Sequence, residues 1–285
     1  MSLAKVWLIT GSSTGFGRAM TEHVLASGDI AVATLRSPEV LAELASKYSK
    51  DRLLVLKLDV SKSQEIKDAF AAAVEKFGRI DVVYNNAAIP IFGEAEAVPE
   101  DTARAMFDVN LWGAINVSKE AVRVMREVNK PAGGHLLQVS SIAGFTAIPG
   151  MSYYCASKSG LIAFSEALSK EVDPAWNIRV TIVEPGAFRT AGPTALVRVA
   201  SLPAYETVMA APRKSIEVDV LSVMQDPAKG VEILYKIAAL PDPPLFLPLG
   251  KDAIALAKAK YAQMVESTAA VTSWSDELQV MASDE

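Results

Sequence analysis

"KVWLITGSSTGFGRAM", residues 5–20, runs from an apolar stretch directly into a glycine-rich one. The continuous apolar residues at 5–10 are typical of a buried strand, and a helix is expected over 15–28. Gly11, Gly15 and Gly17 between them allow a tight turn and a close approach of the backbone to a pyrophosphate. No Gly-Lys-Ser/Thr follows, which excludes a P-loop. The stretch therefore predicts a strand, a phosphate-binding turn and a helix, with a plain turn as the alternative.

The same alternation of strand and helix continues along the chain. Helical patterns separate further apolar runs, which predict strands over 30–35, 53–60, 80–88, 135–141, 178–186 and 245–250. The longest helical pattern covers about 99–129, and another runs over 61–78 with Ser61 or Ser63 as its cap and Gly78 at its end. Continuous apolar strands alternating with helices predict a parallel sheet covered on both faces. We therefore predict a doubly wound α/β fold of about seven strands, with ligands at the carboxyl ends of the strands.

No linker rich in proline, glycine or serine divides the chain, and we find no internal repeat, so one domain over 1–285 is expected. Residues 187–227 carry four prolines between the sixth strand and the next helix, which favours a lid or substrate loop. The segment from about 266 to 285 is polar and acidic, and we expect it to be mobile, or docked on the body through Trp274 and Leu278.

Composition excludes several classes of partner and site. The 285 residues are 51% hydrophobic with a net charge of −5 and no basic run, so nucleic acid is not an expected partner. Cys155 is the single cysteine, which fits a reducing compartment. We find no signal-peptide pattern and no apolar run of about 18–20 residues, so a cytoplasmic protein without a membrane partner is expected. Two histidines and no HExxH or paired CxxC predict no metal site.

The stretch "SYYCASKSG", residues 152–160, places Tyr154 and Lys158 four residues apart, on one face of a helix. This pair could be a surface tyrosine stacked on a lysine stem. Alternatively, it is a proton donor whose pKa, ordinarily near 10, is lowered by the neighbouring cation. The spacing by itself leaves both interpretations open.

Taken together, the motifs resemble those of the classical short-chain dehydrogenases/reductases, in the family's order and over nearly the whole chain. They are TGSSTGFG at 10–17, Asp59 after the third strand, NNAA at 85–88, Asn110 in FDVNLWG, Ser141 in VSSIAG, Tyr154 and Lys158 in YCASK, and PGAFRT at 185–190. The family's usual NNAG reads NNAA here, which leaves the local backbone at Ala88 in question. The resemblance implies a Rossmann-type sheet, a nicotinamide cofactor and an oxidoreductase.

The resemblance also implies a catalytic set. Tyr154 would be the general acid/base, and Lys158 would favour its phenolate. Ser141 would hold the substrate oxygen, with Ser140 as the second choice. Asn110, near an irregularity in its helix, would hold a water that links Lys158 to solvent. As alternatives, Ser141 could simply end a strand, and Asn110 could be an ordinary polar helix residue.

Cofactor binding is likewise implied for a longer set of positions. Asp59 would accept from the adenine amino group, or else cap the helix that follows it, and Thr190 would touch the nicotinamide carboxamide. The full set is Gly11, Ser13, Gly15, Phe16, Gly17, Arg36, Asp59, Val60, Asn86, Ala87, Ala88, Tyr154, Lys158, Pro185, Gly186, Phe188 and Thr190.

The end of the second strand predicts which cofactor is used. An acidic residue there would bind the ribose hydroxyls of NAD and repel a 2′-phosphate. The sequence instead reads Leu35-Arg36, with no acid before Glu39. Because arginine pairs well with phosphate, we favour NADP(H) over NAD(H), with a solvated arginine as the alternative.

The substrate is expected to be a small hydrophobic ketone, aldehyde or secondary alcohol. This expectation rests on apolar candidates for the pocket: Ile89, Ile91, Phe92, Phe145, Ile148, Met151, Phe188, Leu196, Tyr205 and Met209. The chain looks like the branch that contains hydroxysteroid and retinol dehydrogenases and carbonyl reductases. We therefore predict an NADP(H)-dependent carbonyl reductase, and the resemblance implies a homo-oligomer, a dimer or tetramer. The alternatives are an NAD-linked secondary alcohol dehydrogenase and a non-catalytic NADP-binding redox sensor.

Overall fold

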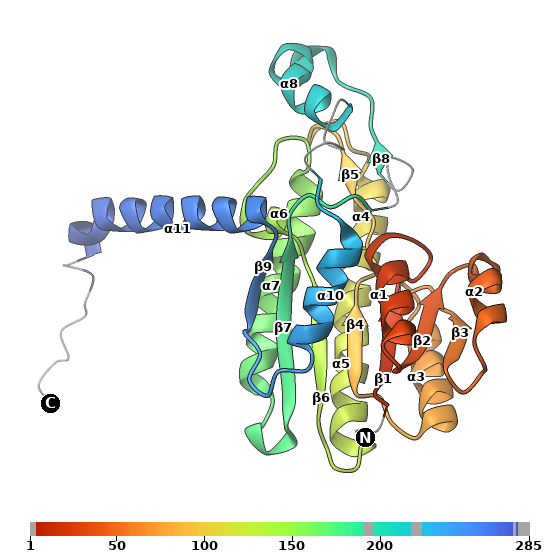
Figure 1. The fold of residues 1–285 in the computed structure, drawn as a ribbon. Helices are drawn as coiled ribbons and strands as arrows, with labels where there is room; N and C mark the ends of the chain where they lie inside the picture. Colours follow the sequence, from red (N-terminus) through yellow and green to blue (C-terminus); the bar gives the residue numbers. More distant parts are fainter. Residues whose placement is uncertain (1–3, 191–195, 218–223, 276–277, 279–285) are drawn as a thin grey trace, which may run out of the picture.

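The computed structural model describes residues 4–190, 196–217, 224–275 and 278. Seven parallel strands form one twisted sheet in the order β3-β2-β1-β4-β6-β7-β9 (Figure 1). The strands are β1 (Val6–Thr10), β2 (Ile30–Leu35), β3 (Leu53–Lys57), β4 (Val82–Asn85), β6 (Gly134–Val139), β7 (Ile178–Pro185) and β9 (Phe246–Leu249). The chain winds outward from β1 to β3, then crosses back to β4 and winds the other way. The predicted doubly wound, Rossmann-type sheet is confirmed, and its order reverses between β1 and β4, where such sheets bind ligands.

Three strands end two or three residues earlier than the sequence predicts, because the residues that follow them make turn and cap contacts. β3 ends at Lys57, and the Asp59 carboxylate then accepts from the backbone N–H and the hydroxyl of Ser61. β4 ends at Asn85, and β6 ends at Val139, just before Ser141 caps a short helix. The carboxyl ends of these strands are therefore followed by polar loops.

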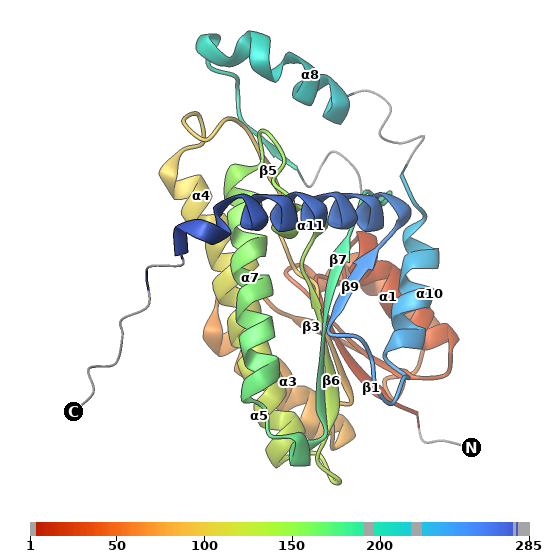
Figure 2. The same ribbon diagram turned by 90° about the vertical axis from the view of Figure 1, so that its left-hand side faces the viewer.

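Helices cover both faces of the sheet, as predicted (Figure 2). One apolar core joins the sheet to α1 (Gly15–Ala26), α2 (Ala42–Lys47) and α10 (Pro227–Ile237), and a second core joins its other face to α3 (Ser63–Phe77), α5 (Ala114–Glu127) and α7 (Ser152–Glu171). Single-turn 3₁₀ helices precede α2 (Pro38–Leu41) and β7 (Pro174–Trp176). Packing of the α-helices on both faces holds the sheet, and with it the loops at the carboxyl ends of the strands.

Three details of the helix ends and interiors bear on the predictions. Gly78 ends α3 in the left-handed conformation at φ 75°, as expected. Neither Ser61 nor Ser63 caps that helix, so the predicted cap is wrong; the Glu65 side chain instead accepts from the Asp59 N–H at 2.8 Å. The long helical region is α4 (Glu100–Phe107) and α5, joined by a π-helical turn over Asp108–Gly113, the irregularity predicted around Asn110.

The segment predicted as a lid leaves the sheet after β7. Its described part contains β8 (Val197–Arg198), a 3₁₀ turn (Pro203–Tyr205) and α8 (Glu206–Glu217), which stands beyond the upper ends of the strands in Figure 1. β8 pairs in parallel with β5 (Ile91–Phe92) in a two-stranded sheet that the sequence did not predict. Residues 191–195 and 218–223 of the predicted lid lie outside the described residues.

The chain ends in a long helix, α11 (Lys251–Val271), followed by a 3₁₀ turn (Thr272–Ser275). This helix extends well beyond the sheet in Figure 1. Trp274 is 78% exposed and Leu278 75% exposed, so the predicted docking of these side chains on the body is wrong. Among the described residues, no helix combines the length and the hydropathy that are needed to cross a bilayer.

Candidate active site

A cavity of about 520 Å³ lies at the carboxyl ends of the strands, where the sheet order reverses. Its wall brings together almost every residue that the sequence predicted for catalysis or cofactor binding. These are Gly11, Ser13, Gly15, Phe16, Arg36, Asp59, Val60, Asn86, Ala87, Ala88, Ser141, Tyr154, Lys158, Pro185, Gly186, Phe188 and Thr190. Most of these residues lie far apart in the sequence but share one surface, because they follow six parallel strands whose carboxyl ends lie along one edge of the sheet.

The glycine-rich turn after β1 forms one end of this wall. Gly11 and Gly15 have φ angles of +70° and +55°, which L side chains rarely adopt. A Cβ atom on Gly17 would lie 2.2 Å from the Gly11 carbonyl oxygen, so Gly17 lets α1 begin against the turn without itself lining the cavity. The first turn of α1 carries no acidic side chain. The backbone here fits the pyrophosphate of a dinucleotide beside a helix N-terminus.

Asn86 ties the end of β4 to this turn. Its side-chain N–H donates to the Thr10 carbonyl oxygen at 3.0 Å, and its backbone N–H donates to the Thr10 hydroxyl at 2.9 Å. Ala88 lines the cavity without adopting a positive φ, so the loop does not require the glycine usual at this position. The change to NNAA therefore leaves the local backbone intact.

Arg36, at the end of β2, is exposed on the cavity wall. Within the described residues its guanidinium forms no hydrogen bond or ion pair. Its charge nevertheless contributes to lowering the pKa of Asp59, an effect led by the hydrogen bonds from Ser61 and opposed by burial. An unpaired cation and a carboxylate thus stand at the ends of β2 and β3.

Tyr154, Lys158 and Ser141 meet at the opposite end of the cavity. Ser141 is the N-cap of α6 (Ile142–Phe145), where its Oγ accepts from the Ala143 N–H at 3.1 Å. It also hydrogen-bonds to the Tyr154 phenol. Ser140, by contrast, is buried and donates to the Lys158 carbonyl oxygen at 3.0 Å, so its hydroxyl is used within the protein. This difference favours Ser141 over Ser140 as the group that faces a ligand.

The pKa values of the pair differ from the expectation drawn from the sequence. Burial raises the pKa of Tyr154 to about 12, although the hydrogen bond from Ser141 opposes the shift. Burial also lowers the pKa of Lys158 to about 8. The protein alone therefore favours a neutral phenol at pH 7, with a buried ammonium 5.9 Å from the centre of its ring.

Asn110 does not line the cavity. Its side chain is fully buried in the π-helical turn, where it accepts from the Ile89 N–H at 2.7 Å and donates to the Ile89 carbonyl oxygen at 2.9 Å. It also donates to the Ser157 hydroxyl at 3.3 Å. In this arrangement Asn110 fixes the chain after β4, and Ile89 itself lines the cavity.

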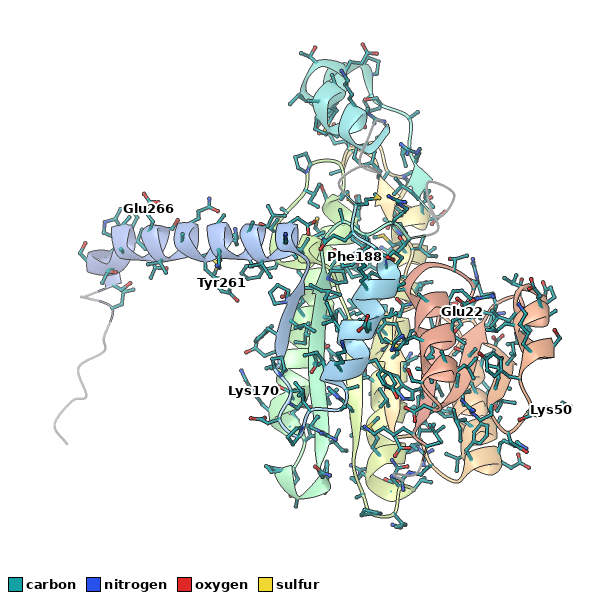
Figure 3. All side chains as sticks on the ribbon, viewed as in Figure 1. Glu22, Lys50, Lys170, Phe188, Tyr261 and Glu266 are labelled. Atoms are coloured by element: carbon teal, nitrogen blue, oxygen red, sulfur yellow. The ribbon has the colours of Figure 1, made fainter. Side chains whose placement is uncertain are left out.

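The apolar residues predicted for the substrate pocket lie in several different places. Ile89 and Phe188 line the cavity, and Phe188, labelled in Figure 3, packs on Phe16 at a ring distance of 4.8 Å. Ile91 and Phe92 are buried in β5. Phe145 instead packs against the tilted ring of Tyr261 of α11, outside the cavity. Tyr205 of the predicted lid donates to Glu96, and Met209 is buried without lining the cavity.

Sequence reasoning missed some of the cavity wall. Additional lining residues are Thr14, Leu35, Leu58, Ser61, Pro90, Ala105, Val109 and Val139. Leu35, Leu58 and Val139 lie within the predicted strands and Thr14 lies within the glycine-rich turn, so their places near the carboxyl ends of strands were a signal for them. Ala105 and Val109 come from α4 and the π-helical turn and carry no signal in the sequence.

A carboxylate outside the cavity fixes the loop after β7. Asp252, in the first turn of α11, accepts from the Ala187 N–H at 2.6 Å and from the Gln225 side-chain amide at 2.7 Å. A Cβ atom on Gly186 would lie 2.2 Å from this carboxylate. Gln225 also exchanges backbone hydrogen bonds with Ala187 and Arg189, each 2.9 Å long. The two ends of the predicted lid are therefore joined beside the cavity wall.

Comparisons with known proteins agree with this geometry. The sequence model of the short chain dehydrogenase family matches residues 5–198. Oxidoreductase BOA17 of Botryotinia fuckeliana is 37% identical over 254 residues, which cover 88% of this chain and 91% of that protein. Oxidoreductase C162.03 of Schizosaccharomyces pombe is 38% identical over 260 residues, covering 91% and 86%. The crystal structure of a short-chain dehydrogenase from Streptomyces avermitilis matches with a TM-score of 0.89 and 32% identity, covering 98% of this chain and all of that one.

The family match spans more than half of the chain, and the two relatives align with most of its length. Membership implies an enzyme that works with a nicotinamide cofactor. From the glycine-rich turn, the strand order and these comparisons together, the chain belongs to the short chain dehydrogenase family and is an oxidoreductase.

Proposed function

We propose that this protein is an NADP(H)-dependent carbonyl reductase that interconverts a small hydrophobic ketone or aldehyde and its alcohol. The observation that carries the proposal is the convergence of Tyr154, Ser141 and Lys158 on the cavity that the glycine-rich turn also lines. A surface tyrosine stacked on lysine would not bring a serine hydroxyl and a phosphate-binding turn to the same wall.

The bound nicotinamide would supply the hydride for reduction, or take it up in the reverse direction. The other tasks fall to the chain itself. Gly11, Gly15 and the start of α1 would hold the pyrophosphate, and Asp59 would accept from the adenine amino group. Thr190, Pro185 and Gly186 would form the wall of the cavity beside the nicotinamide.

Tyr154 would give its proton to the carbonyl oxygen of the substrate. A pKa of about 12 keeps the phenol protonated across the neutral range, as a proton donor must be. The Ser141 hydroxyl would hold the same oxygen and stabilise the negative charge that develops there. Lys158, buried as a cation below the ring, would stabilise the phenolate that remains after the transfer.

Arg36 supports NADP(H) as the cofactor. It is exposed on the cavity wall at the position where an acidic side chain would bind the ribose of NAD. A guanidinium with no partner among the described residues fits a 2′-phosphate, which it can bind through two hydrogen bonds. We further propose a cytoplasmic homo-oligomer in which 1–285 forms one domain.

A fluorescence titration with NADPH and NADH tests the cofactor assignment without knowledge of the substrate. NADPH should bind at least about tenfold more tightly than NADH, and Arg36→Ala should abolish most of that difference. Lys50→Ala, which removes an exposed charge from the loop after α2, is the matched control (Figure 3). A preference for NADH would overturn the role of Arg36 and favour an NAD-linked alcohol dehydrogenase. Cofactor binding without turnover on a broad panel of carbonyls would favour a non-catalytic redox sensor.

A further inference from the structure

One member of the proposed catalytic set, Ser141, stands at the start of a very short helix. α6 has only four residues, Ile142–Phe145, and Ser141 is its N-cap. A single helical turn is not stable by itself. The position of the Ser141 hydroxyl therefore depends on the two helices that pack against α6, which are α7 and α11.

α7 holds α6 through its backbone. A Cβ atom on Gly144 would lie 2.8 Å from the backbone carbonyl carbon of Lys158, so a glycine lets α6 lie this close to α7. The Ser159 hydroxyl also donates to the Gly144 carbonyl oxygen. Because α7 carries Tyr154 as well, this contact brings the Ser141 hydroxyl to the Tyr154 phenol.

The C-terminal helix α11 packs on other residues of α6, beside which it begins (Figure 1). Ala253 and Ala257 are 0% and 5% exposed and pack on Ile142. The Tyr261 ring lies 4.8 Å from the Phe145 ring. Positions 253, 257 and 261 are four residues apart and share one side of the helix, which we call the α11 face. Two alanines let α11 approach α6 closely, and a larger side chain there would push α6 away.

The α11 face is separate from the packing that holds the sheet. Ile142, Ala253 and Ala257 form an apolar cluster apart from the two cores that cover the faces of the sheet. From 262 to 275 every residue of the helix and the turn after it is exposed. The sequence model of the family matches residues 5–198, which leaves α11 outside the matched part. The contact with α6 can therefore change while the main cores stay intact.

We propose that the α11 face holds α6 against α7 and thereby positions the Ser141 hydroxyl beside the Tyr154 phenol. Its effect on rate rests on the proposed function, in which Ser141 holds the oxygen that receives the Tyr154 proton. A displacement of about 1 Å at such a group can cost about 100-fold in rate. Residues 142–145, 253, 257 and 261 do not line the cavity, so the effect falls on the transition state and not on cofactor binding.

Ala257→Leu tests the α11 face, with Ala255→Leu as its matched control. Both add the same volume to one helix, but position 255 is exposed. Ala257→Leu should lower kcat about 10-fold or more for a carbonyl that the wild type reduces, with the Kd for NADPH within about threefold. Ala255→Leu should match the wild type. Equal kcat in all three proteins would overturn the proposal, and so would an equal loss of kcat and NADPH affinity.

Tyr261 offers a second test, which does not depend on how the fold accepts a larger side chain at position 257. Tyr261→Ala removes the ring contact with Phe145, and Tyr261→Phe keeps it. Tyr261→Ala should lower kcat about threefold or more, and Tyr261→Phe should stay within about twofold of wild type. Wild-type kcat in Tyr261→Ala would contradict the role of this contact.

A double-mutant cycle with Ser141→Ala separates positioning from a general structural effect. If the α11 face acts through Ser141, Ala257→Leu should lower kcat less than about twofold when Ser141→Ala is already present. The full 10-fold loss in that background would show that the face does not act through Ser141.

Hydrogen exchange without cofactor tests the contact independently of turnover. The Gly144 and Thr146 amides donate to carbonyl oxygens at the start of α6, at 2.9 and 2.8 Å. They should exchange at least about tenfold faster in Ala257→Leu than in Ala255→Leu, with amides of β1 unchanged. Unchanged exchange in α6 would overturn the inference whether or not the protein reduces a carbonyl. Faster exchange in a protein that reduces no carbonyl would support the contact and refute only the proposed function.

Discussion

The Nζ atom of Lys158 lies 5.9 Å from the centre of the Tyr154 ring, one turn away on α7. The same nitrogen donates to the Val139 carbonyl oxygen at the end of β6, at 2.9 Å, and the lysine is only 2% exposed. Burial lowers the pKa of Lys158 to about 8, which leaves the side chain mostly charged at pH 7. The sheet thus holds a desolvated cation beside the phenol, where its effect on a phenolate is much stronger than in water.

Replacing this cation tests its role in the proposed reaction. Lys158→Met keeps most of the buried volume but removes the charge, and we expect kcat to fall by about 100-fold or more. Stability should change little, because the relief from burying a cation offsets the lost hydrogen bond to Val139. Steady-state kinetics and urea unfolding measure the two effects. Wild-type kcat in a folded Lys158→Met variant would contradict the role.

Asp252 should act on the cavity through the loop after β7. Asp252→Ala leaves the Ala187 N–H and the Gln225 amide without their acceptor, and the loss of two hydrogen bonds should weaken NADPH binding about 10- to 100-fold. Asp252→Asn retains an acceptor and should stay within about threefold of wild type. Glu266→Ala, at the exposed end of the same helix, is the control.

Hydrogen exchange distinguishes this positioning role from a loss of general stability. Without cofactor, the peptide that contains Ala187 should exchange at least about tenfold faster in Asp252→Ala, and peptides from β1 and β4 should be unchanged. Unchanged exchange at Ala187 would contradict the positioning role. Because the exchange is measured without cofactor, this outcome does not depend on the proposed cofactor binding.

The predicted lid is attached to the body by a buried ion pair. Both carboxylate oxygens of Glu94 accept from Nη2 of Arg213, at 2.7 and 2.8 Å, and the Ser201 hydroxyl donates to the same carboxylate at 2.6 Å. Despite its burial, these hydrogen bonds lower the pKa of Glu94 to about 2, so the attachment persists until strongly acidic pH. Its contribution to stability is complete above about pH 4.5 and is lost as the pH falls toward 2.

Arg213→Ala should release this attachment, because it leaves a buried carboxylate without its cation. Subtilisin should then cleave within 196–217 at least about tenfold faster than in the wild type, and Lys214→Ala, an exposed neighbour, should show the wild-type rate. Equal cleavage rates in all three proteins would show that the ion pair does not hold the lid.

The buried Glu184 on β7 should make the free energy of unfolding depend on pH. It is 4% exposed, its carboxyl group forms no hydrogen bond or ion pair with any described residue, and burial raises its pKa to about 7. The folded state therefore favours the protonated acid, and this favourable contribution is lost as the pH rises from about 4.5 to 7. Glu184→Gln should be more stable than wild type above pH 7, by on the order of 1–3 kcal/mol, and equally stable near pH 4.5. Urea unfolding at the two pH values, with the exposed Glu75→Gln as control, checks the sign; a constant difference would contradict it.

The strands and the site residues near them could be predicted because their signals are local. Apolar runs locate each strand, and a parallel sheet brings their carboxyl ends together, so the strand pattern places Gly11, Arg36 and Ser141 along one edge. The role of Ser141 there is expected only from the family resemblance. The π-helical turn at Asn110 is expected only from the family resemblance. The contacts of Asn110 with Ile89 depend on how two distant segments pack, which no local pattern reports.

Long-range contacts account for most of what the sequence did not predict. Asp252 lies 65 residues from Ala187, and Glu94 lies 119 residues from Arg213, so neither pair has a recognisable spacing. β5 and β8 are two residues long, too short for an alternating pattern. The family resemblance implies that Lys158 favours the Tyr154 phenolate, but the sequence does not report the burial that raises the pKa of the tyrosine.

The most direct test of the central claim compares wild-type protein with Tyr154→Phe, measuring both NADPH affinity and kcat for a carbonyl that the wild type reduces. The substitution removes only the phenolic hydroxyl that we propose as proton donor. We predict a kcat at least about 100-fold lower, with the Kd for NADPH within about threefold of wild type. Turnover at the wild-type rate by Tyr154→Phe would contradict the proposed role of Tyr154 in catalysis.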